Sequence, residues 1–429
     1  MEKFDVIVVG AGPAGSTAGY LLAQAGLNVL IVERGQTPGS KNVSGGLIYS
    51  KLAAQIFPEF WNSAPVERAI TNHQLTMLSE NASVGLDFRS QEAAQPPYNA
   101  FSVLRARFDP WLAKQAEDAG AALITGVTVD SLLVENGRVL GIQAGPDLIG
   151  ADVVVVAEGT RSLLLKLAGL REEFHPHDVS LGVKEIIALP EKTIEERFQC
   201  TSDTGMAYTF VGHTCGIEGG GFLYTNKASL SLGIVVKIDA LYQSKRQPHQ
   251  VLDEFKSHPL VARLIDGGEV VEYSAQTVHR GGFHLMSKLY GDGYVVAGSA
   301  ARLLLNNIMT LRGMDFAMIS AAEAARAILA AREQQNYSAT ALAAYETNLK
   351  QTSIYQDWQT FKATYPLLEN KRLFEVYPEL ACKVMENLFS PTTQPGSKAL
   401  AVLREEMKGK VSMVDLVKDV YQISRGVVL

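Results

Sequence analysis

The sequence predicts an α/β fold in which a parallel-sheet domain is interrupted by an inserted antiparallel-sheet domain and followed by a helical C-terminal region. Three observations predict this fold. A glycine motif follows the first apolar segment, two later apolar segments also end at glycine, and much of the sequence between them has alternating apolar residues. At 429 residues the chain is too long for one compact core, so several lobes are expected.

The first segment predicts a Rossmann-like phosphate site. Apolar residues 4–9 lead into a G-x-G-x-x-G motif and then into a predicted helix that ends at Gly26. We expect Gly10 to form the turn, Gly12 to let backbone N–H groups approach a pyrophosphate, and Gly15 to pack the helix on the strand. The helix N-terminus adds partial positive charge. The predicted site comprises Gly10, Gly12, Pro13, Ala14 and Gly15.

The next strand, residues 28–32, ends in Glu33 and Arg34. A carboxylate at this position can accept hydrogen bonds from the ribose of an adenine dinucleotide, so FAD and NAD both fit. The following loop, residues 38–46, contains paired glycines that can lie against a flat ring, although an ordinary turn-rich crossover is the alternative. From this loop the candidate binding residues are Lys41, Asn42, Gly45 and Gly46.

Residues 74–78, 84–88 and 100–104 are predicted to be short strands of an antiparallel insertion. A helix is then predicted, with Asp109 as its N-cap and Pro110 at its first position. Arg105 precedes that cap and is placed either to pair with a pyrophosphate or to be solvated.

The chain then returns to the first domain. Residues 127–134, which include the candidate residue Val129, form a predicted hairpin with residues 139–142. The buried strand 152–157 ends at the candidate residues Glu158 and Gly159. A third such segment, residues 291–301, ends at Gly298 and Ser299. It precedes Arg312, Gly313 and a helix from Met314, whose N-terminus is expected to approach the cofactor.

A second antiparallel sheet is predicted between residues 175 and 285, together with an amphipathic helix over 248–265. Residues after 338 are predicted to be mostly helical, with their aromatic side chains packed back onto the core. The predicted domains are therefore a dinucleotide-binding domain (1–73, 101–174 and 286–337), an antiparallel-sheet substrate domain (74–100 and 175–285) and a helical C-terminal region (338–429).

Composition and charge exclude several classes. A net charge of −6 provides no basic patch for nucleic acid. The three cysteines contain no C-x-x-C, so neither a dithiol pair nor a cluster held by four local thiolates is expected. The histidines have no common metal-ligand spacing, and no metal is predicted. Without a signal peptide or a spanning apolar run, we expect a cytoplasmic protein whose membrane contact, if it occurs, is peripheral on the inner face.

Taken together, these segments resemble the electron transfer flavoprotein–quinone oxidoreductases, and specifically the FixC-like branch. The resemblance runs nearly end to end, and its marks are Gly10-x-Gly12-x-x-Gly15 with Glu33-Arg34, residues 40–46, 103–105, 108–112, 182–185, 219–225, His258-Pro259 and 312–315. It implies FAD in a glutathione-reductase-like fold, with flavin-centred chemistry and no catalytic side chain.

The resemblance also implies partners. Electrons would arrive from electron transfer flavoprotein subunits and leave to a quinone, to another small acceptor or to a ferredoxin-like iron–sulfur protein. Single-chain relatives carry their own iron–sulfur domain, whereas this chain has too few cysteines for one, so the cluster would lie on a separate protein.

Two departures from the family pattern keep other functions open. Members commonly have Gly-Asp where this chain has Gly298-Ser299, and Arg302 stands in a segment that is usually neutral. Serine cannot accept hydrogen bonds as a carboxylate does. The alternatives are a geranylgeranyl-reductase-like flavoenzyme, an NAD(P)H-dependent flavoenzyme, and a non-catalytic FixC-like scaffold with weakened FAD binding.

Overall fold

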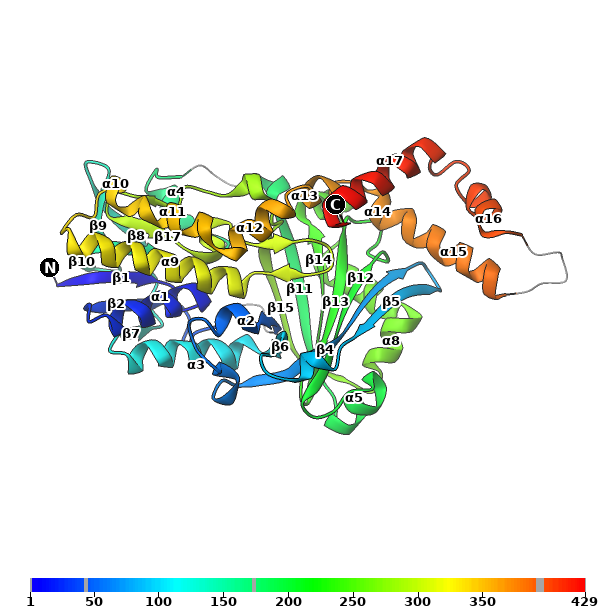
Figure 1. The fold of residues 1–429 in the computed structure, drawn as a ribbon, viewed down its shortest axis with the longest axis horizontal. Helices are drawn as coiled ribbons and strands as arrows, with labels where there is room; N and C mark the ends of the chain where they lie inside the picture. Colours follow the sequence, from blue (N-terminus) through cyan, green and yellow to red (C-terminus); the bar gives the residue numbers. More distant parts are fainter. Residues whose placement is uncertain (1, 42–44, 172–174, 391–396, 429) are drawn as a thin grey trace.

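The structure is a computed structural model that describes residues 2–41, 45–171, 175–390 and 397–428. Figure 1 shows a parallel sheet with its helices on the side of the N-terminus, a large second sheet beside them, and helices α15, α16 and α17 beyond the large sheet. This arrangement confirms the predicted α/β fold class with a helical C-terminal region.

The first sheet has eight strands, and its central part is parallel in the order β7-β2-β1-β10-β17. These strands are β1 (Lys3–Val9), β2 (Val29–Glu33), β7 (Ala122–Thr125), β10 (Asp147–Val156) and β17 (Tyr294–Val296). The predicted hairpin is formed by β8 (Ser131–Glu135) and β9 (Arg138–Ala144), and β9 pairs with β10, while β16 (Tyr290–Gly291) pairs with β17. Asn136 and Gly137 both have positive φ, as their hairpin turn requires.

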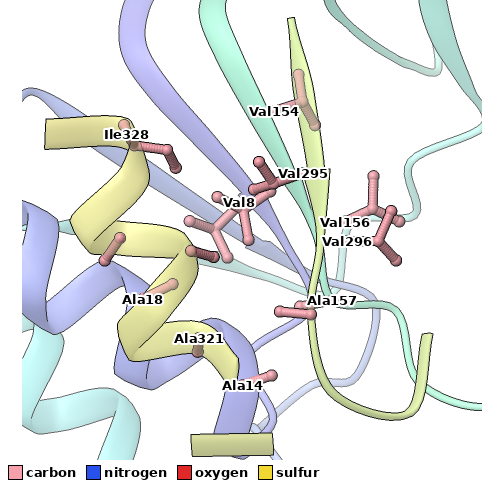
Figure 2. Packing of buried hydrophobic residues seen from close by; sticks show 14 of the residues in the cluster. Val8, Ala14, Ala18, Val154, Val156, Ala157, Val295, Val296, Ala321 and Ile328 are labelled. Carbon is pink, nitrogen blue, oxygen red and sulfur yellow. The ribbon is translucent and has the colours of Figure 1, made fainter. Parts of the chain in front are cut away.

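Helices α1 (Pro13–Gln24) and α9 (Met314–Glu333) pack together beside this sheet, and α3 (Arg105–Asp118) packs on α1. Ala14, Ala18 and Ala321 face the valines of β1, β10 and β17 (Figure 2). Small residues let the helices approach the sheet closely, and valines buried on both faces are typical of a parallel sheet. The core of this domain therefore holds the strand ends in fixed positions.

The second sheet has nine strands in the order β15-β11-β14-β13-β12-β4-β6-β3, with β5 paired to β4. All its pairings are antiparallel except that between β4 and β12. The strands are β3 (Gly46–Tyr49), β4 (Val66–Leu78), β5 (Ser83–Arg89), β6 (Ala100–Val103), β11 (Val179–Ala188), β12 (Thr204–Val211), β13 (Gly219–Thr225), β14 (Ser229–Lys237) and β15 (Glu269–His279).

The sheet is strongly curved. Strand β3 lies at one end of the strand order, yet Gly45, directly before it, packs against Ser231 in β14 near the other end. Strand β4 begins at Val66 and runs across the predicted domain boundary at residue 73, and β3 also joins this sheet. The domain boundaries as a whole stay a prediction.

Two predicted helices differ in the structure. Helix α3 begins at Arg105, one turn before the predicted N-cap Asp109, and Pro110 lies inside the helix. The Asp109 carboxylate forms an ion pair with Arg105 within the helix, so it does not cap the helix. The predicted helix 248–265 is two helices, α7 (Pro248–Ser257) and α8 (Pro259–Ile265). They separate at His258, whose ψ of 132° is extended because the following proline disfavours helical backbone at that residue.

The other helices are mostly short. They are α2 (Ser50–Ala53), α4 (Leu163–Leu167), α5 (Glu191–Phe198), α6 (Ile238–Ser244), α10 (Ala339–Leu342), α11 (Ala344–Gln351), α12 (Ser353–Thr360), α13 (Thr364–Leu367), α14 (Arg372–Glu375), α15 (Tyr377–Phe389), α16 (Ala399–Glu406) and α17 (Met413–Ile423), and a two-stranded sheet joins β18 (Leu305–Asn306) to β19 (Leu311–Arg312). Tyr345 and Trp358 are buried as predicted, but the prediction is wrong for Phe389 and Tyr421, which are 82% and 57% exposed.

An ion pair between the partly exposed Arg372 and the buried Asp419 ties α17 to α14. Arg372 donates two hydrogen bonds, of 2.7 and 2.9 Å, to the Asp419 carboxylate, which also accepts from the Tyr377 hydroxyl. Burial opposes the charged form, but the hydrogen bonds from Arg372 and Tyr377 lower the pKa of Asp419 to about 2. This contribution to stability is present above the unfolded pKa near 4 and is lost as pH falls through the folded pKa.

We therefore expect Asp419→Asn to destabilise the docking of α17 at pH 7 by about 2 kcal/mol. Hydrogen exchange of the α17 amides measures this, with the exposed Asp266→Asn as the control. In the wild type the same amides should lose protection between about pH 4 and pH 2. Equal protection in Asp419→Asn and wild type would contradict the assignment.

Candidate functional site

The carboxyl ends of four parallel strands meet at one edge of the first sheet. Backbone hydrogen bonds join the end of β2 to Gly10 (2.8 Å), the end of β1 to Ala157 (2.9 Å) and the end of β10 to Ala297 (3.1 Å). Ligands of such sheets bind at the carboxyl ends, where the strand order changes direction. The three glycine-terminated segments of the sequence are therefore brought to the same place.

The glycines of the first turn have different surroundings. Gly10 has φ +100°, and a Cβ there would lie 2.6 Å from the carbonyl oxygen of Ala157. A Cβ on Gly15 would collide with the carbonyl oxygen of Gly10. A Cβ on Gly12, in contrast, would have Arg105 Nη2 as its nearest neighbour, at 3.7 Å. The space before Gly12 is therefore open, and it lies at the N-terminus of α1.

Glu33 is buried and holds two turns together. Its carboxylate accepts hydrogen bonds from the backbone N–H of Ala11 (2.9 Å) and of Gly35 (2.7 Å). Each carboxylate oxygen retains capacity for a further donor, such as a ribose hydroxyl. The sequence predicted the ribose contact but not this structural role of Glu33.

A cavity of about 280 Å³ lies at these strand ends, between the first domain and the curved sheet. Among the residues predicted to bind a cofactor, those lining it are Gly12, Pro13, Ala14, Arg34, Gly45, Gly46, Arg105, Glu158, Ser299, Gly313 and Met314. Those outside its lining are Gly10, Gly15, Glu33, Lys41, Val129, Gly159, Gly298 and Arg312. Asn42 lies outside the described residues.

Several of the residues outside the lining support the cavity wall. Gly298 has φ +65° and packs against Ala14 and Ala317, which lets the end of β17 approach α1 and α9. The carbonyl oxygen of Lys41 accepts a hydrogen bond of 2.7 Å from Gln276, which itself lines the cavity. Val129 is half-buried against the core of the first domain.

The Arg312 side chain pairs with carboxylates of this chain. It donates to Asp315 (2.7 Å) and to Asp357 of α12 (2.5 Å), and its guanidinium lies 5.4 Å from the ring centre of Tyr49. Burial raises the pKa of Asp315, while the Arg312 charge lowers it. Arg312 therefore anchors the first turn of α9, whose Gly313 and Met314 reach the cavity.

The cavity lining is rich in positive charge. Arg34, Arg105, Arg161 and Lys184 line it, and Glu158 is the carboxylate among the lining residues. Arg105 is held by a bidentate pair with Asp109. Burial raises the pKa of Glu158, although hydrogen bonds from the first backbone N–H groups of α4 counteract the effect. With the N-termini of α1 and α9, these cations favour a pyrophosphate.

Sequence reasoning missed Lys184 as a cavity residue. It is buried in β11, its ammonium donates to the carbonyl oxygen of Gly45, and its Nζ lies 5.2 Å from the ring centre of Phe222. Burial, and next the charge of Arg105, lowers the pKa of Lys184 to about 7. The available signal was a lysine within a mostly apolar strand, because unpaired charges are rarely buried.

A second cavity, of about 140 Å³, adjoins the first. Both are lined by Leu47, Phe222, Tyr224, Val235, Val278 and Leu311. The second is more apolar and extends along β12 and β13, with Ala207, Thr209 and Phe210 in its wall. Its lining also includes the charged residues Glu218, Lys237 and Arg280. The site therefore combines a polar, cationic part with an adjoining apolar part, as sites for amphipathic ligands do.

The departures at Ser299 and Arg302 differ in their consequences. Ser299 lines the first cavity. The Arg302 side chain donates to the carbonyl oxygen of Leu285 at 3.3 Å, and Arg302 is not part of the lining of either cavity. Blockage of the site by Arg302, one ground for the scaffold hypothesis, is therefore not observed.

The described ranges contain no cluster of three or more histidine, cysteine, aspartate or glutamate side chains suited to a metal ion. Within the same ranges, no helix combines the length and apolar character needed to cross a bilayer.

Comparison with known proteins identifies the family. Family models described as "FAD binding domain", "ETF-QO, ubiquinone-binding" and "ETF-QO/FixC family C-terminal domain" match residues 3–208, 179–278 and 364–427. The protein FixC of Escherichia coli K12 is 42% identical over 420 residues, which is 97% of each chain. The chain belongs to the ETF-QO/FixC family. Similar FixC-family relatives are the probable electron transfer flavoprotein-quinone oxidoreductase YdiS of E. coli K12, at 42% identity over 97% of each chain, and FixC of Bradyrhizobium diazoefficiens, at 38% over 99%.

Solved structures support the fold of this FixC-family chain. A geranylgeranyl bacteriochlorophyll reductase-like protein from Thermoplasma acidophilum has a TM-score of 0.74 at 21% identity, over 99% of this chain and 100% of that one. The myxobacterial halogenase CndH, a variant of FAD-dependent halogenases, has a TM-score of 0.66 at 17% identity, covering 97% of this chain and 99% of its own.

The FixC-family chain is an FAD-dependent electron transfer oxidoreductase, as predicted. The cavity fits this cofactor. A Cβ on Gly12 would enter the open space before it, residues at the N-termini of α1 and α9 line the cavity, and so do arginines.

Proposed function

We propose that this chain passes electrons from an electron transfer flavoprotein, through bound FAD, to a quinone. The observation that carries the proposal is the pair of adjoining cavities, one cationic at the parallel-strand ends and one more apolar. The family model described as ubiquinone-binding covers residues 179–278, which include β11–β15 and several residues of both cavity walls. The relative YdiS is named as a probable electron transfer flavoprotein-quinone oxidoreductase.

We assign FAD contacts to residues of the first cavity and its supports. Backbone groups at Gly12 and the side chain of Arg105 would hold the pyrophosphate, and Glu33 would accept from the ribose. Bound FAD supplies the redox chemistry. The chain orients it through the glycine turns and the N-terminus of α9, and the apolar residues shared by the two cavities exclude water between FAD and acceptor.

The proposal extends to the other partners. The described cysteines are Cys200, Cys215 and Cys382, in separate segments of the chain, so we assign any iron–sulfur cluster in the electron path to a separate ferredoxin-like protein. A quinone acceptor resides in a membrane, so the proposed function requires peripheral contact with the inner face of the cell membrane.

The test uses the purified FAD-loaded protein. Mixing it with reduced electron transfer flavoprotein should bleach its absorbance near ~450 nm, and a short-chain quinone should restore the absorbance. Rapid bleaching by NADH alone would instead support an NAD(P)H-dependent flavoenzyme. A protein that stays colourless with added FAD would support a scaffold and overturn the proposal.

A substitution in the second cavity tests the acceptor site. Thr209 lies in the wall of that cavity and not in the lining of the first. We expect Thr209→Phe to fill the apolar cavity and lower quinone reduction at least ~10-fold, because a quinone ring would be excluded sterically. FAD content and bleaching by reduced electron transfer flavoprotein should stay at wild-type values.

The matched control is Thr209→Val, which keeps the volume of the side chain. Its quinone reduction should match that of the wild type. Full quinone reduction by Thr209→Phe would contradict the assignment of this cavity to the acceptor.

A further inference from the structure

Lys184 occupies an unusual position for a charged side chain. It lies in β11, flanked by Gly233 of β14 and Ser274 of β15, and it is only 8% exposed. Its ammonium group points to the first cavity, where it donates to the carbonyl oxygen of Gly45 and faces the ring of Phe222. Burial of an ammonium is costly unless an opposite charge compensates for it.

The charges around Lys184 provide little compensation. Arg105 of α3 disfavours the ammonium form and Glu272 of β15 favours it, but the repulsion from Arg105 is the larger effect. The adjacent Glu185 faces the opposite side of β11, where it pairs with Lys256 at 3.0 Å. Three further charged residues line the cavity, the two cations Arg34 and Arg161 and the carboxylate Glu158.

Within the described residues, no carboxylate lies within salt-bridge distance of Lys184. Its principal neighbours are a neutral carbonyl and an aromatic ring, and these favour the ammonium much less than a paired carboxylate does. A gain or loss of negative charge in the cavity would therefore change the protonation of this amine. The low pKa of Lys184, about 7, places that change near neutral pH.

We propose that Lys184 takes up one proton from solvent when the cofactor in this cavity is reduced and releases it on oxidation. The inference rests on the proposed function for the location of FAD. Bound FAD would take two electrons from the donor, together with the proton that a reduced flavin itself binds. In addition, one proton would pass from water to the Lys184 amine. Oxidation by the acceptor would remove the two electrons, and the Lys184 proton would return to water.

The physical reason is electrostatic. Electrons add negative charge to a cavity of low effective dielectric constant, where an adjacent ammonium interacts with that charge more strongly than it would in water. Lys184 thereby stabilises the reduced state at neutral pH and connects the potential of the cofactor to pH.

The experiment measures the midpoint potential of bound FAD against pH by spectroelectrochemistry, with dithionite as reductant. We compare the wild type with Lys184→Met, which removes the amine, and with Lys184→Arg, which keeps a permanent charge. Above about pH 7, uptake of one extra proton per two electrons adds ~30 mV per pH unit to the slope of midpoint potential against pH. This corresponds to a tenfold change in the equilibrium constant of reduction per pH unit. Both variants should lack this added slope.

Lys256→Met serves as the matched control, because Lys256 lies outside the cavity lining and pairs with Glu185 on the other side of β11. It should keep the wild-type slope. FAD affinity of the apoproteins, followed by fluorescence at pH 6 and 9, provides a readout independent of reduction. In Lys184→Met this affinity should change less with pH than in the wild type.

The results separate this inference from the proposed function, because dithionite replaces the electron transfer flavoprotein. A slope that depends on Lys184 supports the inference even if that flavoprotein does not reduce the cofactor. An unchanged slope in Lys184→Arg overturns it, whether or not Lys184→Met retains FAD.

Discussion

Replacing Gly12 by alanine is expected to abolish FAD binding at micromolar cofactor while leaving the apoprotein folded. The nearest protein atom to the new Cβ would be Arg105 Nη2, at 3.7 Å, so the substitution fits the protein itself. The methyl group would instead occupy the space into which a pyrophosphate must come to reach the N-terminus of α1. Two charge-assisted hydrogen bonds from backbone N–H groups of this turn to the pyrophosphate would be lost, at about 1.5–3 kcal/mol each. This loss corresponds to a ~100-fold or larger decrease in FAD affinity.

Fluorescence titration of the apoprotein with FAD measures the affinity, and thermal unfolding of the apoprotein measures the fold. Gly15→Ala is the contrasting variant, because its Cβ collides with the carbonyl oxygen of Gly10. That variant should unfold at a lower temperature even without FAD. Wild-type FAD affinity in Gly12→Ala would show that the pyrophosphate does not lie against this turn.

Replacing Glu33 by glutamine is expected to lower the free energy of unfolding of the apoprotein by about 2–4 kcal/mol. The buried carboxylate accepts from two backbone N–H groups, those of Ala11 and Gly35. A glutamine side chain has one acceptor oxygen and presents an NH₂ group to the other donor, which is then left buried without an acceptor. Because the same hydrogen bonds position the phosphate turn, FAD affinity should fall as well.

Urea unfolding of the apoproteins measures the first effect. Glu117→Gln makes the same chemical change at an exposed position of α3 and should leave the free energy of unfolding unchanged. If Glu33→Gln matched that control in stability but lost FAD, Glu33 would contact the ribose without supporting the turn.

The sequence signals for the predicted site were clearest where local geometry and chemistry coincide. A glycine that must adopt φ +100° beside a strand end, such as Gly10, leaves a motif in the sequence. So does the carboxylate of Glu33, which follows a strand directly. The role of Arg105 was left open between pyrophosphate and solvent, and the structure directs it to the first cavity, held by Asp109.

Other features depended on side-chain pairings that the sequence pattern does not specify. Asp109 has the residue type and the following proline of an N-cap, yet Arg105 uses its carboxylate within the helix. Arg312 was predicted to contact the cofactor, and in the structure its guanidinium pairs with Asp315 and Asp357. Lys184 received no role because the curvature that brings β11 beside Gly45 leaves no periodic signal in either segment.

The sequence by itself determined the parallel core, its glycine turns, the acidic end of β2 and the family to which the chain is similar. These depend on short-range patterns, because a strand, a turn and a helix that are adjacent in the chain constrain one another directly. Only the tertiary structure decided which charged side chains face the cavity and which are neutralised by opposite charges elsewhere in this chain. The reason is that side-chain pairing depends on distances between segments far apart in the chain, and the curved nine-stranded sheet sets those distances here.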